Sequence, residues 1–212
     1  MKIEVKSVSK EFEGVSVLQD VSMTLEEGNI YGFIGRNGSG KSVLLKMICS
    51  LYEPTSGEIL FDGVNVIKEK NFPPSTRALI EKPCFLPDLS GFENLELLAN
   101  IQGKIGKEEI ENSLKQVNLF DEKDKKYSKY SLGMKQKLGI AQVLMEDPKI
   151  MILDEPLNGI EEETANKLRD ILIEEKNKGK IIIVASHIKE DIEKLADIVY
   201  HFDGGRVKLE KS

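Results

Sequence analysis

Hydrophobic residues alternate with polar ones through much of the first 30 positions, for example at Val15, Val17 and Val21. This period of two is typical of strands with one buried face. Residues 149–153 and 181–185 instead contain uninterrupted apolar runs, which are typical of parallel strands buried on both faces. We therefore expect an α/β fold in which helical crossovers join parallel strands, with a β-rich N-terminal part.

The middle of the chain, from about residue 81 to residue 146, has the pattern of helices. Ser90 and Glu93 have the spacing of a capping box, in which each side chain satisfies a backbone N–H at a helix start. Before this block, a hairpin is predicted around Asp62 and Gly63. We expect a single domain over residues 1–212, with a core at about 1–80 and 147–212 and a helical subdomain at 81–146.

Composition limits the class of protein. A length of 212 residues allows one core with an inserted subdomain, but not two full catalytic domains. The net charge of −6 argues against a protein held mainly by nucleic-acid phosphates, so no nucleic-acid partner is expected. The charged N-terminus and the lack of a long apolar run predict a cytoplasmic protein that meets a membrane through a partner. Cys49 and Cys84 are expected to be small core residues.

The strongest chemical signal is a glycine-rich segment at residues 35–42, directly after an apolar run at 30–34. Glycines allow positive φ angles, so that backbone N–H groups can surround an anion. Lys41 brings a positive charge to the outer phosphates, Ser42 can ligate Mg²⁺, and a helix predicted at 43–48 adds its dipole. The segment thus predicts a nucleoside triphosphate site. The predicted contacts are Gly35, Arg36, Asn37, Gly38, Ser39, Gly40, Lys41 and Ser42.

Asp154 and Glu155 end the apolar run at 149–153 and form the second signal. In open α/β folds the carboxyl ends of the strands form the ligand-binding edge. There Asp154 can hold Mg²⁺, directly or through water, and Glu155 can act as general base on the attacking water. Two solvated acids at the start of a loop are the alternative interpretation. Combined with the phosphate loop, the pair predicts a Mg²⁺-dependent nucleotide hydrolase.

Two further segments resemble the ABC ATPase superfamily. Residues 130–136 are similar to its signature motif, and Ser186 and His187 are similar to its switch-histidine segment. Residues 131–155, together with 80–83, resemble ATP-binding subunits of the bacitracin-resistance and lantibiotic-immunity type. The resemblance implies a P-loop NTPase core with a parallel sheet, an N-terminal antiparallel β-subdomain and an inserted α-helical subdomain.

The same resemblance implies roles for single residues. Ser131 and Gly133 would contact the γ-phosphate held by a second subunit, so that two chains enclose two ATP molecules. His187 would orient water, although its position alone fits an ordinary polar residue equally well. Phe12 would stack on adenine, with a simple core or surface phenylalanine as the alternative, and stacking does not separate ATP from GTP. Thr55 and Glu81 complete the predicted nucleotide contacts. The predicted catalytic residues are Glu155, His187 and Lys41, and the predicted metal site is Ser42, Asp154 and Glu81.

Four positions depart from the commonest pattern of the superfamily. Glu81 stands where most members have a glutamine that senses Mg²⁺ and links to the membrane subunit, and Glu161 stands where they have aspartate. Leu132 and Met134 replace the usual glycine and glutamine of the signature. A carboxylate at position 81 adds negative charge beside the phosphates, so we expect altered metal dependence and coupling. None of the four changes removes a catalytic group.

The resemblance implies an ATP-binding and hydrolysing subunit of a bacterial ABC membrane transporter, with export of an antimicrobial peptide or related compound as its task. The expected cofactors are ATP and Mg²⁺. The expected partners are a multi-spanning membrane subunit and a second ATPase chain, either identical or a paralogue, at the inner face of the cell membrane. The helical block at 81–126 would offer a groove to the membrane subunit. A soluble ABC ATPase, a regulatory nucleotide-binding module and a P-loop kinase are the alternatives, and the Ser131 motif with His187 argues against the kinase.

Overall fold

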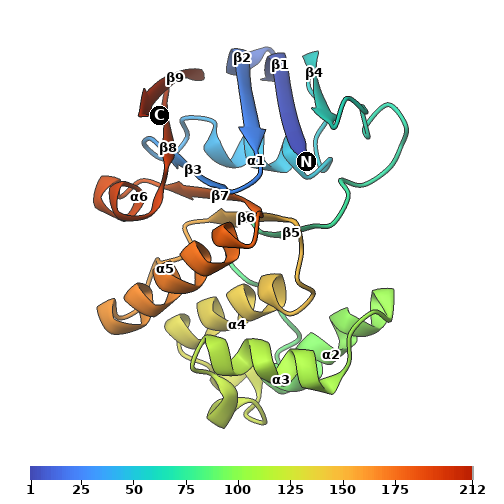
Figure 1. Ribbon diagram of the computed structural model, residues 1–212, viewed down its shortest axis with the longest axis vertical. Helices are drawn as coiled ribbons and strands as arrows, with labels where there is room; N and C mark the ends of the chain where they lie inside the picture. The colour runs from blue at the N-terminus through green and yellow to red at the C-terminus, as the bar shows by residue number, and fades with distance from the viewer. Residues whose placement is uncertain (212) are drawn as a thin grey trace.

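A twisted, mostly parallel sheet forms the centre of the protein in a computed structural model that describes residues 1–211 (Figure 1). Its strand order is β5-β6-β7-β3-β8-β9. Within the described residues, β8 and β9 pair antiparallel and the other neighbours pair parallel. The strands are β3 (Asn29–Ile34), β5 (Thr76–Leu79), β6 (Ile150–Asp154), β7 (Ile181–Ser186), β8 (Ile198–Asp203) and β9 (Arg206–Lys211).

A separate antiparallel sheet lies above the central one, with the order β2-β1-β4. Its strands are β1 (Lys2–Phe12), β2 (Val15–Glu26) and β4 (Ser56–Phe61). Ile3 and Val5 are buried while Glu4 between them is only half-buried, as the alternating pattern predicts. The turn expected at Asp62 and Gly63 is present, since Phe61 and Val64 pair antiparallel across it through backbone hydrogen bonds of 2.8 and 2.9 Å. The prediction of a hairpin is wrong only in its second strand, because the next strand in the described chain is β5.

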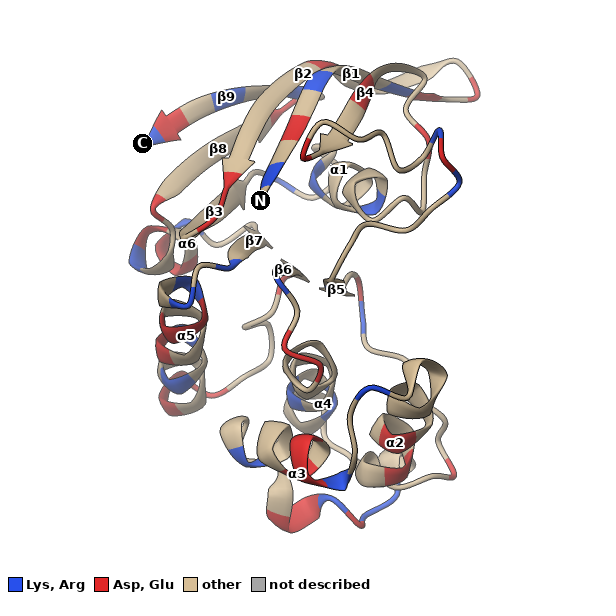
Figure 2. Cartoon of the chain, turned by 45° about the vertical axis from the view of Figure 1, so that its right-hand side comes forward, with Lys and Arg blue, Asp and Glu red and all other residues tan. Residues whose placement is uncertain are grey.

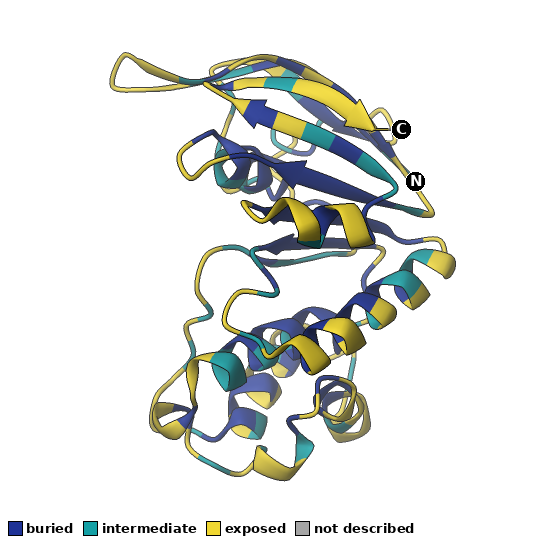
Figure 3. Cartoon of the chain, turned by 90° about the vertical axis from the view of Figure 1, so that its left-hand side faces the viewer, coloured by how far each residue is buried: buried dark blue, intermediate teal, exposed yellow. Residues whose placement is uncertain are grey.

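The central sheet is buried on both faces, which confirms the α/β fold class. Alternate residues of β3 enter two hydrophobic clusters: Tyr31 and Phe33 pack toward α1 (Lys41–Ile48) and the antiparallel sheet, and Ile30 and Ile34 pack toward the opposite helices. These include α5 (Glu162–Asn177) and α6 (Lys189–Leu195). Figure 3 shows β6 and β7 fully buried, as their continuous apolar runs predict. Charged residues of both signs are interspersed on the outer helices (Figure 2).

Three helices lie between β5 and β6 in sequence and form the lower part of the molecule in Figure 1. Ser90 and Glu93 form the predicted capping box, since Ser90 Oγ accepts from Glu93 N at 3.2 Å and Glu93 Oε2 accepts from Ser90 N at 2.7 Å. Cys84, in the irregular segment before this helix, is exposed, so the prediction of two core cysteines holds for Cys49 alone. The elements are α2 (Gly91–Gln102), α3 (Lys107–Gln116), the 3₁₀ turns η1 (Phe120–Glu122) and η2 (Tyr127–Lys129), and α4 (Leu132–Leu144).

Adjacent parallel strands bring distant parts of the sequence to one edge of the sheet. Ile34 at the end of β3 pairs with Ser186 at the end of β7, and Asp154 at the end of β6 pairs with Ala185. The segments that follow these three strands therefore share one edge, where ligands of open α/β folds bind. They are the loop at 35–42, the pair Asp154 and Glu155, and the segment that begins at His187.

Candidate nucleotide-binding site

Three positions of the loop at residues 35–42, namely Gly35, Gly38 and Gly40, have a backbone or surroundings that favour glycine. Gly38 and Gly40 have φ angles of 78° and 106°, in the left-handed region that disfavours side chains. A Cβ on Gly40 would lie 2.6 Å from Leu18 Cδ2, and a Cβ on Gly35 would lie 2.4 Å from Phe202 O. The close approach of these backbones forms a cradle that leads directly into the N-terminus of α1, an arrangement suited to phosphate.

Lys41 is held inside this cradle. Its Nζ donates to Gly35 O at 2.6 Å and to Arg36 O at 3.2 Å, and the residue is 5% exposed. Burial lowers the pKa of Lys41, while the charges of Glu155 and Asp154 oppose that shift. Ser39 Oγ is also buried and has no hydrogen-bond partner among residues 1–211. An ammonium group and an unpaired hydroxyl in the same cradle fit a bound phosphate chain.

A cavity of about 350 Å³ opens over the loop. Its walls join the loop to the carboxylates that end β6, so the phosphate loop and Asp154 and Glu155 form one site as the sequence predicts. Arg36 lies in the loop but does not line the cavity. The lining residues are Val17, Asn37, Gly38, Ser39, Gly40, Lys41, Ser42, Val43, Asp154 and Glu155.

Ser42 and Asp154 form the part of the site that fits a metal ion. Ser42 Oγ donates to Asp154 Oδ2 at 2.5 Å. Burial raises the pKa of Asp154, the hydrogen bond from Ser42 lowers it, and the nearby charges of Glu155 and Glu81 raise it further. A hydroxyl, one carboxylate and phosphate oxygens are the ligands with which Mg²⁺ is usually bound beside nucleotides. The donor set present here therefore fits Mg²⁺.

Glu155 makes its closest contacts with the segment that follows β7. Its Oε1 accepts from His187 N at 2.9 Å and lies 2.7 Å from His187 Nδ1, and its Oε2 accepts from Ser186 Oγ at 3.1 Å. The backbone of Glu155 has φ 51°, and its N–H donates to Ala185 O at 2.8 Å. The structure thus joins two of the predicted catalytic residues directly.

Gln136 supports this arrangement and was not singled out from the sequence. It is buried in α4, and its Nε2 donates to the backbone oxygens of Glu155 at 3.0 Å and Pro156 at 3.2 Å. Its place at the end of the signature-like segment 130–136, on the buried face of α4, was the available signal, because buried amides need hydrogen-bond partners.

Phe12 and Thr55 lie outside the cavity. Phe12 ends β1, is 37% exposed, and contacts Tyr52 edge-to-face with ring centroids 5.5 Å apart. Lys10 Nζ lies 4.8 Å from the Phe12 ring centroid. Thr55 Oγ1 accepts from Glu11 N at 3.0 Å, which fixes it beside β1. Neither Phe12 nor Thr55 lines the cavity over the phosphate loop, so the structure of the single chain does not bring them to the phosphate site.

Glu81 does not line the cavity either. Its Oε1 pairs with Lys46 Nζ at 2.5 Å, and Lys46 also lies 5.4 Å from the Tyr52 ring centroid. The structure therefore brings Ser42 and Asp154 together, and it places the Glu81 carboxylate on an ammonium group of α1. Lys46 and Tyr52 were not predicted, because neither belongs to a recognisable motif.

Ser131 and Gly133 lie at the start of α4. Ser131 is exposed and its Oγ accepts from Met134 N at 3.2 Å, so it caps the helix as predicted. A Cβ on Gly133 would lie 3.0 Å from Gly159 O. Neither residue lines the cavity over the phosphate loop. Within one chain, the signature segment and the phosphate loop thus remain separate.

The parallel sheet with its phosphate cradle and terminal carboxylates defines a P-loop nucleoside triphosphatase. The pattern of the family described as "ABC transporter" matches residues 18–158. The chain belongs to this family, as an ATP-binding subunit with ATPase activity, which confirms the family resemblance of the sequence. Within residues 1–211, no helix combines the length and the hydropathy needed to cross a bilayer.

Several named relatives are similar over most of the chain. The uncharacterized ABC transporter ATP-binding protein YybJ of Bacillus subtilis (strain 168) is 42% identical, with 97% of this chain and 94% of that protein covered. The bacitracin transport ATP-binding protein BcrA of Enterococcus faecalis is 38% identical, with 93% and 65% covered. The lantibiotic transport ATP-binding protein SrtF of Streptococcus pyogenes is 33% identical, with 99% and 90% covered.

Solved structures agree with the fold. An ATP-binding subunit of an ABC transporter superposes with a TM-score of 0.89 and 28% identity, covering 100% of this chain and 90% of that one. The cassette MJ0796, a dimer bound to ADP and Pi, gives a TM-score of 0.88 at 23% identity, covering 99% and 98%. These similarities confirm the ABC ATPase fold.

Proposed function

We propose that this chain powers a membrane exporter of antimicrobial peptides or related compounds, as one of two ATPase subunits bound to a multi-spanning membrane subunit. It would lie in the cytoplasm at the inner face of the membrane. The similarity to BcrA and SrtF, named for bacitracin and lantibiotic transport, supports the substrate class. The observation that carries the ATPase role is the contact of Glu155 with His187 beside the phosphate cavity.

The geometry supports a division of work between these residues. Glu155 accepts a proton from the attacking water, and His187 fixes the orientation of the Glu155 carboxylate through Oε1. Lys41 stabilises the negative charge that develops on the phosphate. Ser42 and Asp154 would hold Mg²⁺, which supplies charge neutralisation to the phosphates. Phe12 would stack on the base, with Thr55 and Glu81 beside the nucleotide.

A second chain would complete the site. Ser131 is exposed at a helix N-terminus, where backbone N–H groups and the dipole attract an anion. We propose that Ser131 and Gly133 contact the γ-phosphate bound by the partner chain, in a homodimer or a dimer with a paralogue. The dimeric state of MJ0796 bound to ADP and Pi supports this arrangement by analogy of fold.

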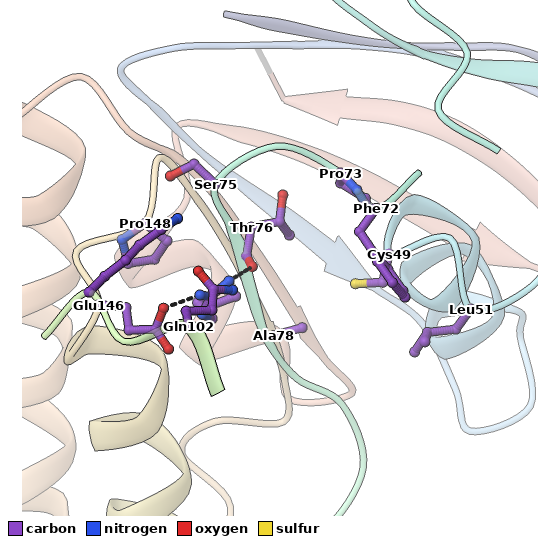
Figure 4. A pocket seen from close by; sticks show the side chains of 12 residues that line it. Cys49, Leu51, Phe72, Pro73, Ser75, Thr76, Ala78, Gln102, Glu146 and Pro148 are labelled. Atoms are coloured by element: carbon purple, nitrogen blue, oxygen red, sulfur yellow. Dashed lines mark hydrogen bonds and ion pairs between the residues drawn. The ribbon is translucent and has the colours of Figure 1, made fainter. Parts of the chain in front are cut away.

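The membrane subunit would dock where the core meets the helical subdomain, which we place at residues 81–146. A cavity of about 400 Å³ lies there (Figure 4). Leu51 and Phe72, which are 58% and 79% exposed, line one side with Cys49, and Gln102 at the end of α2 lines the other. Exposed apolar side chains around a hollow suit a helix of a partner.

Glu155→Gln tests the ATPase and dimer parts of this proposal. The change removes the general base while keeping the shape of the side chain, so hydrolysis should slow at least about 100-fold and an ATP-bound dimer should accumulate. Light scattering with Mg-ATP measures the dimer. Glu163→Gln, at an exposed position of α5, is the matched control and should behave as the wild type. A Glu155→Gln chain that stays monomeric at saturating Mg-ATP would contradict the two-chain site.

Affinity capture from detergent-solubilised membranes of the source organism tests the transport part. The tagged chain should bring down a multi-spanning membrane protein, and Phe72→Asp should reduce its recovery. Recovery of soluble proteins alone would rule out the transport role and leave the ATPase chemistry standing.

A further inference from the structure

Arg169 is a buried charge that the chemistry described above does not use. It lies on α5, is 6% exposed, and its guanidinium makes three hydrogen bonds. Nη2 donates to Asp191 Oδ1 on α6 at 2.6 Å, and Nη1 donates to Asn166 Oδ1 at 2.7 Å and to Glu162 Oε1 at 3.2 Å. The bond to Asp191 is the one that crosses from α5 to α6.

The two helices joined by this bond begin just after the catalytic pair. The loop that leaves Glu155 leads into α5 at Glu162, and Ile188 alone separates His187 from the start of α6. Figure 3 shows α5 and α6 side by side on the outer face of the sheet. A cavity of about 370 Å³ between them is lined by residues of the 157–160 loop, by Arg169 and by Asp191. The segment from Glu155 to α5 and the segment from His187 to α6 are thus joined at two points. One is the contact of Glu155 with His187, and the other is the bond of Arg169 with Asp191.

The short α6 is tied to neighbouring elements by two ion pairs, the exposed Lys189 with Glu210 of β9 at 3.2 Å and Asp191 with the buried Arg169 at 2.6 Å. It is seven residues long, and Ile192 and Leu195 are the residues that it buries. Those apolar contacts are non-directional and tolerate a small rotation, whereas a charge-assisted hydrogen bond specifies an orientation. Of the two ion pairs, the one with Arg169 is shielded from water while Lys189 and Glu210 are exposed and contribute little. Arg169 therefore supplies the stronger directional contact that sets how α6, and with it His187, meets Glu155.

We propose that Arg169 and Asp191 are a positioning pair, which holds His187 in hydrogen-bond contact with Glu155. This inference rests on the proposed roles of Glu155 and His187. A small misplacement of a reacting group costs a large factor in rate, so loss of the pair should lower kcat. ATP binding at the phosphate loop should be preserved, because neither Arg169 nor Asp191 is hydrogen-bonded to Lys41 or to the loop glycines.

Steady-state ATPase kinetics of the full chain test the proposal. Asp191→Asn and Arg169→Met should lower kcat about 10-fold or more and leave KM for ATP within about twofold. Arg169→Lys keeps the charge but not the planar fork, so it should restore part of the rate. Lys167→Met is the matched control, because Lys167 pairs with Glu163 at 3.0 Å on the exposed side of the same helix without reaching α6. It should keep the wild-type kcat.

NMR of the histidine imidazoles distinguishes a loss of positioning from a general loosening of the fold. The chain contains two histidines, so His187 reports on the catalytic contact and His201 on β8 serves as the internal control. In Asp191→Asn the His187 resonances should move toward those of Glu155→Gln, while His201 stays unchanged. Should Arg169→Met fail to fold, the near-isosteric Asp191→Asn decides. Wild-type kcat and His187 resonances in Asp191→Asn, with Glu155→Gln and His187→Ala inactive, would overturn the positioning pair. Active Glu155→Gln and His187→Ala would instead refute the proposed catalytic roles.

Discussion

Ser42 Oγ lies 2.5 Å from Asp154 Oδ2, although 112 residues separate the two in the chain. The hydrogen bond joins the first residues of α1 to the end of β6 and closes the floor of the phosphate cavity. Because the hydroxyl and the carboxylate already face each other, a cation bound between them and the nucleotide would need little rearrangement of the protein.

Ser42→Ala should weaken metal dependence specifically. Loss of one oxygen ligand should raise the free Mg²⁺ needed for half-maximal hydrolysis by about 10-fold or more, while nucleotide binding without Mg²⁺ should persist because Lys41 is untouched. ATPase activity titrated with free Mg²⁺ measures this. Ser128→Ala, at an exposed position, is the control, and an unchanged Mg²⁺ curve for Ser42→Ala would exclude Ser42 from the metal site.

Asp154→Asn should stabilise the nucleotide-free protein while abolishing hydrolysis. Burial raises the pKa of Asp154 above 3.8 in the folded state. The folded protein then binds more protons than the unfolded chain between those two pKa values, so this group's contribution to stability is full below pH 3.8 and is lost as the pH rises through the raised pKa. At pH 7 the asparagine variant should therefore melt a few degrees higher, and the difference should shrink toward pH 4. A lower Tm at pH 7 would contradict this account.

Gly40→Ala should destabilise the fold and remove ATP binding. The left-handed backbone costs about 1–2 kcal/mol with a Cβ, and the contact with Leu18 adds overpacking of about 1–3 kcal/mol. Urea unfolding measures the sum. Gly103→Ala is a matched control, because Gly103 has φ 62° and nothing within 4 Å of its ideal Cβ. Equal losses in the two variants would mean that the contact with Leu18 has no cost.

The ion pair of Lys46 and Glu81 should govern metal dependence and coupling. Lys46→Met frees the carboxylate to approach the phosphates, so the Mg²⁺ requirement should shift. Glu81→Gln should keep ATP binding and change the ATPase response to the membrane subunit. In a double-mutant cycle, adding Lys46→Met to Glu81→Gln should have little further effect. Additive effects would show that the pair seen at 2.5 Å does not act as a unit.

The parts of the site and of the fold that depend on a local sequence motif could be predicted from the sequence. The phosphate loop, the carboxylates after the apolar run of β6 and the capping box at Ser90 each depend on local spacing, and the structure places them as expected. Contacts between side chains that lie on elements distant in sequence could not be predicted. Arg169 with Asp191 and Lys46 with Glu81 are of this kind, because their pairing depends on how helices pack rather than on local sequence.

The antiparallel end of the central sheet was equally hard to anticipate. β8 and β9 pair from Asp203 and Arg206 across a tight turn. Buried and exposed residues do not alternate regularly along these two strands, so their sequences do not show that they pair antiparallel. The predicted hairpin at Asp62 and Gly63 shows the limit of a local signal. The turn forms and Val64 pairs with Phe61 across it, but the residues after Val64 do not continue as a second strand.

The register of β6 against β7 has a consequence for how this protein can change. Asp154 pairs with Ala185, which sets Glu155 opposite the start of the His187 segment. A slip by one residue would displace the carboxylate by about 3.3 Å and point its side chain to the other face of the sheet. An insertion or deletion within either strand would therefore separate Glu155 from His187 and remove the proposed catalytic contact.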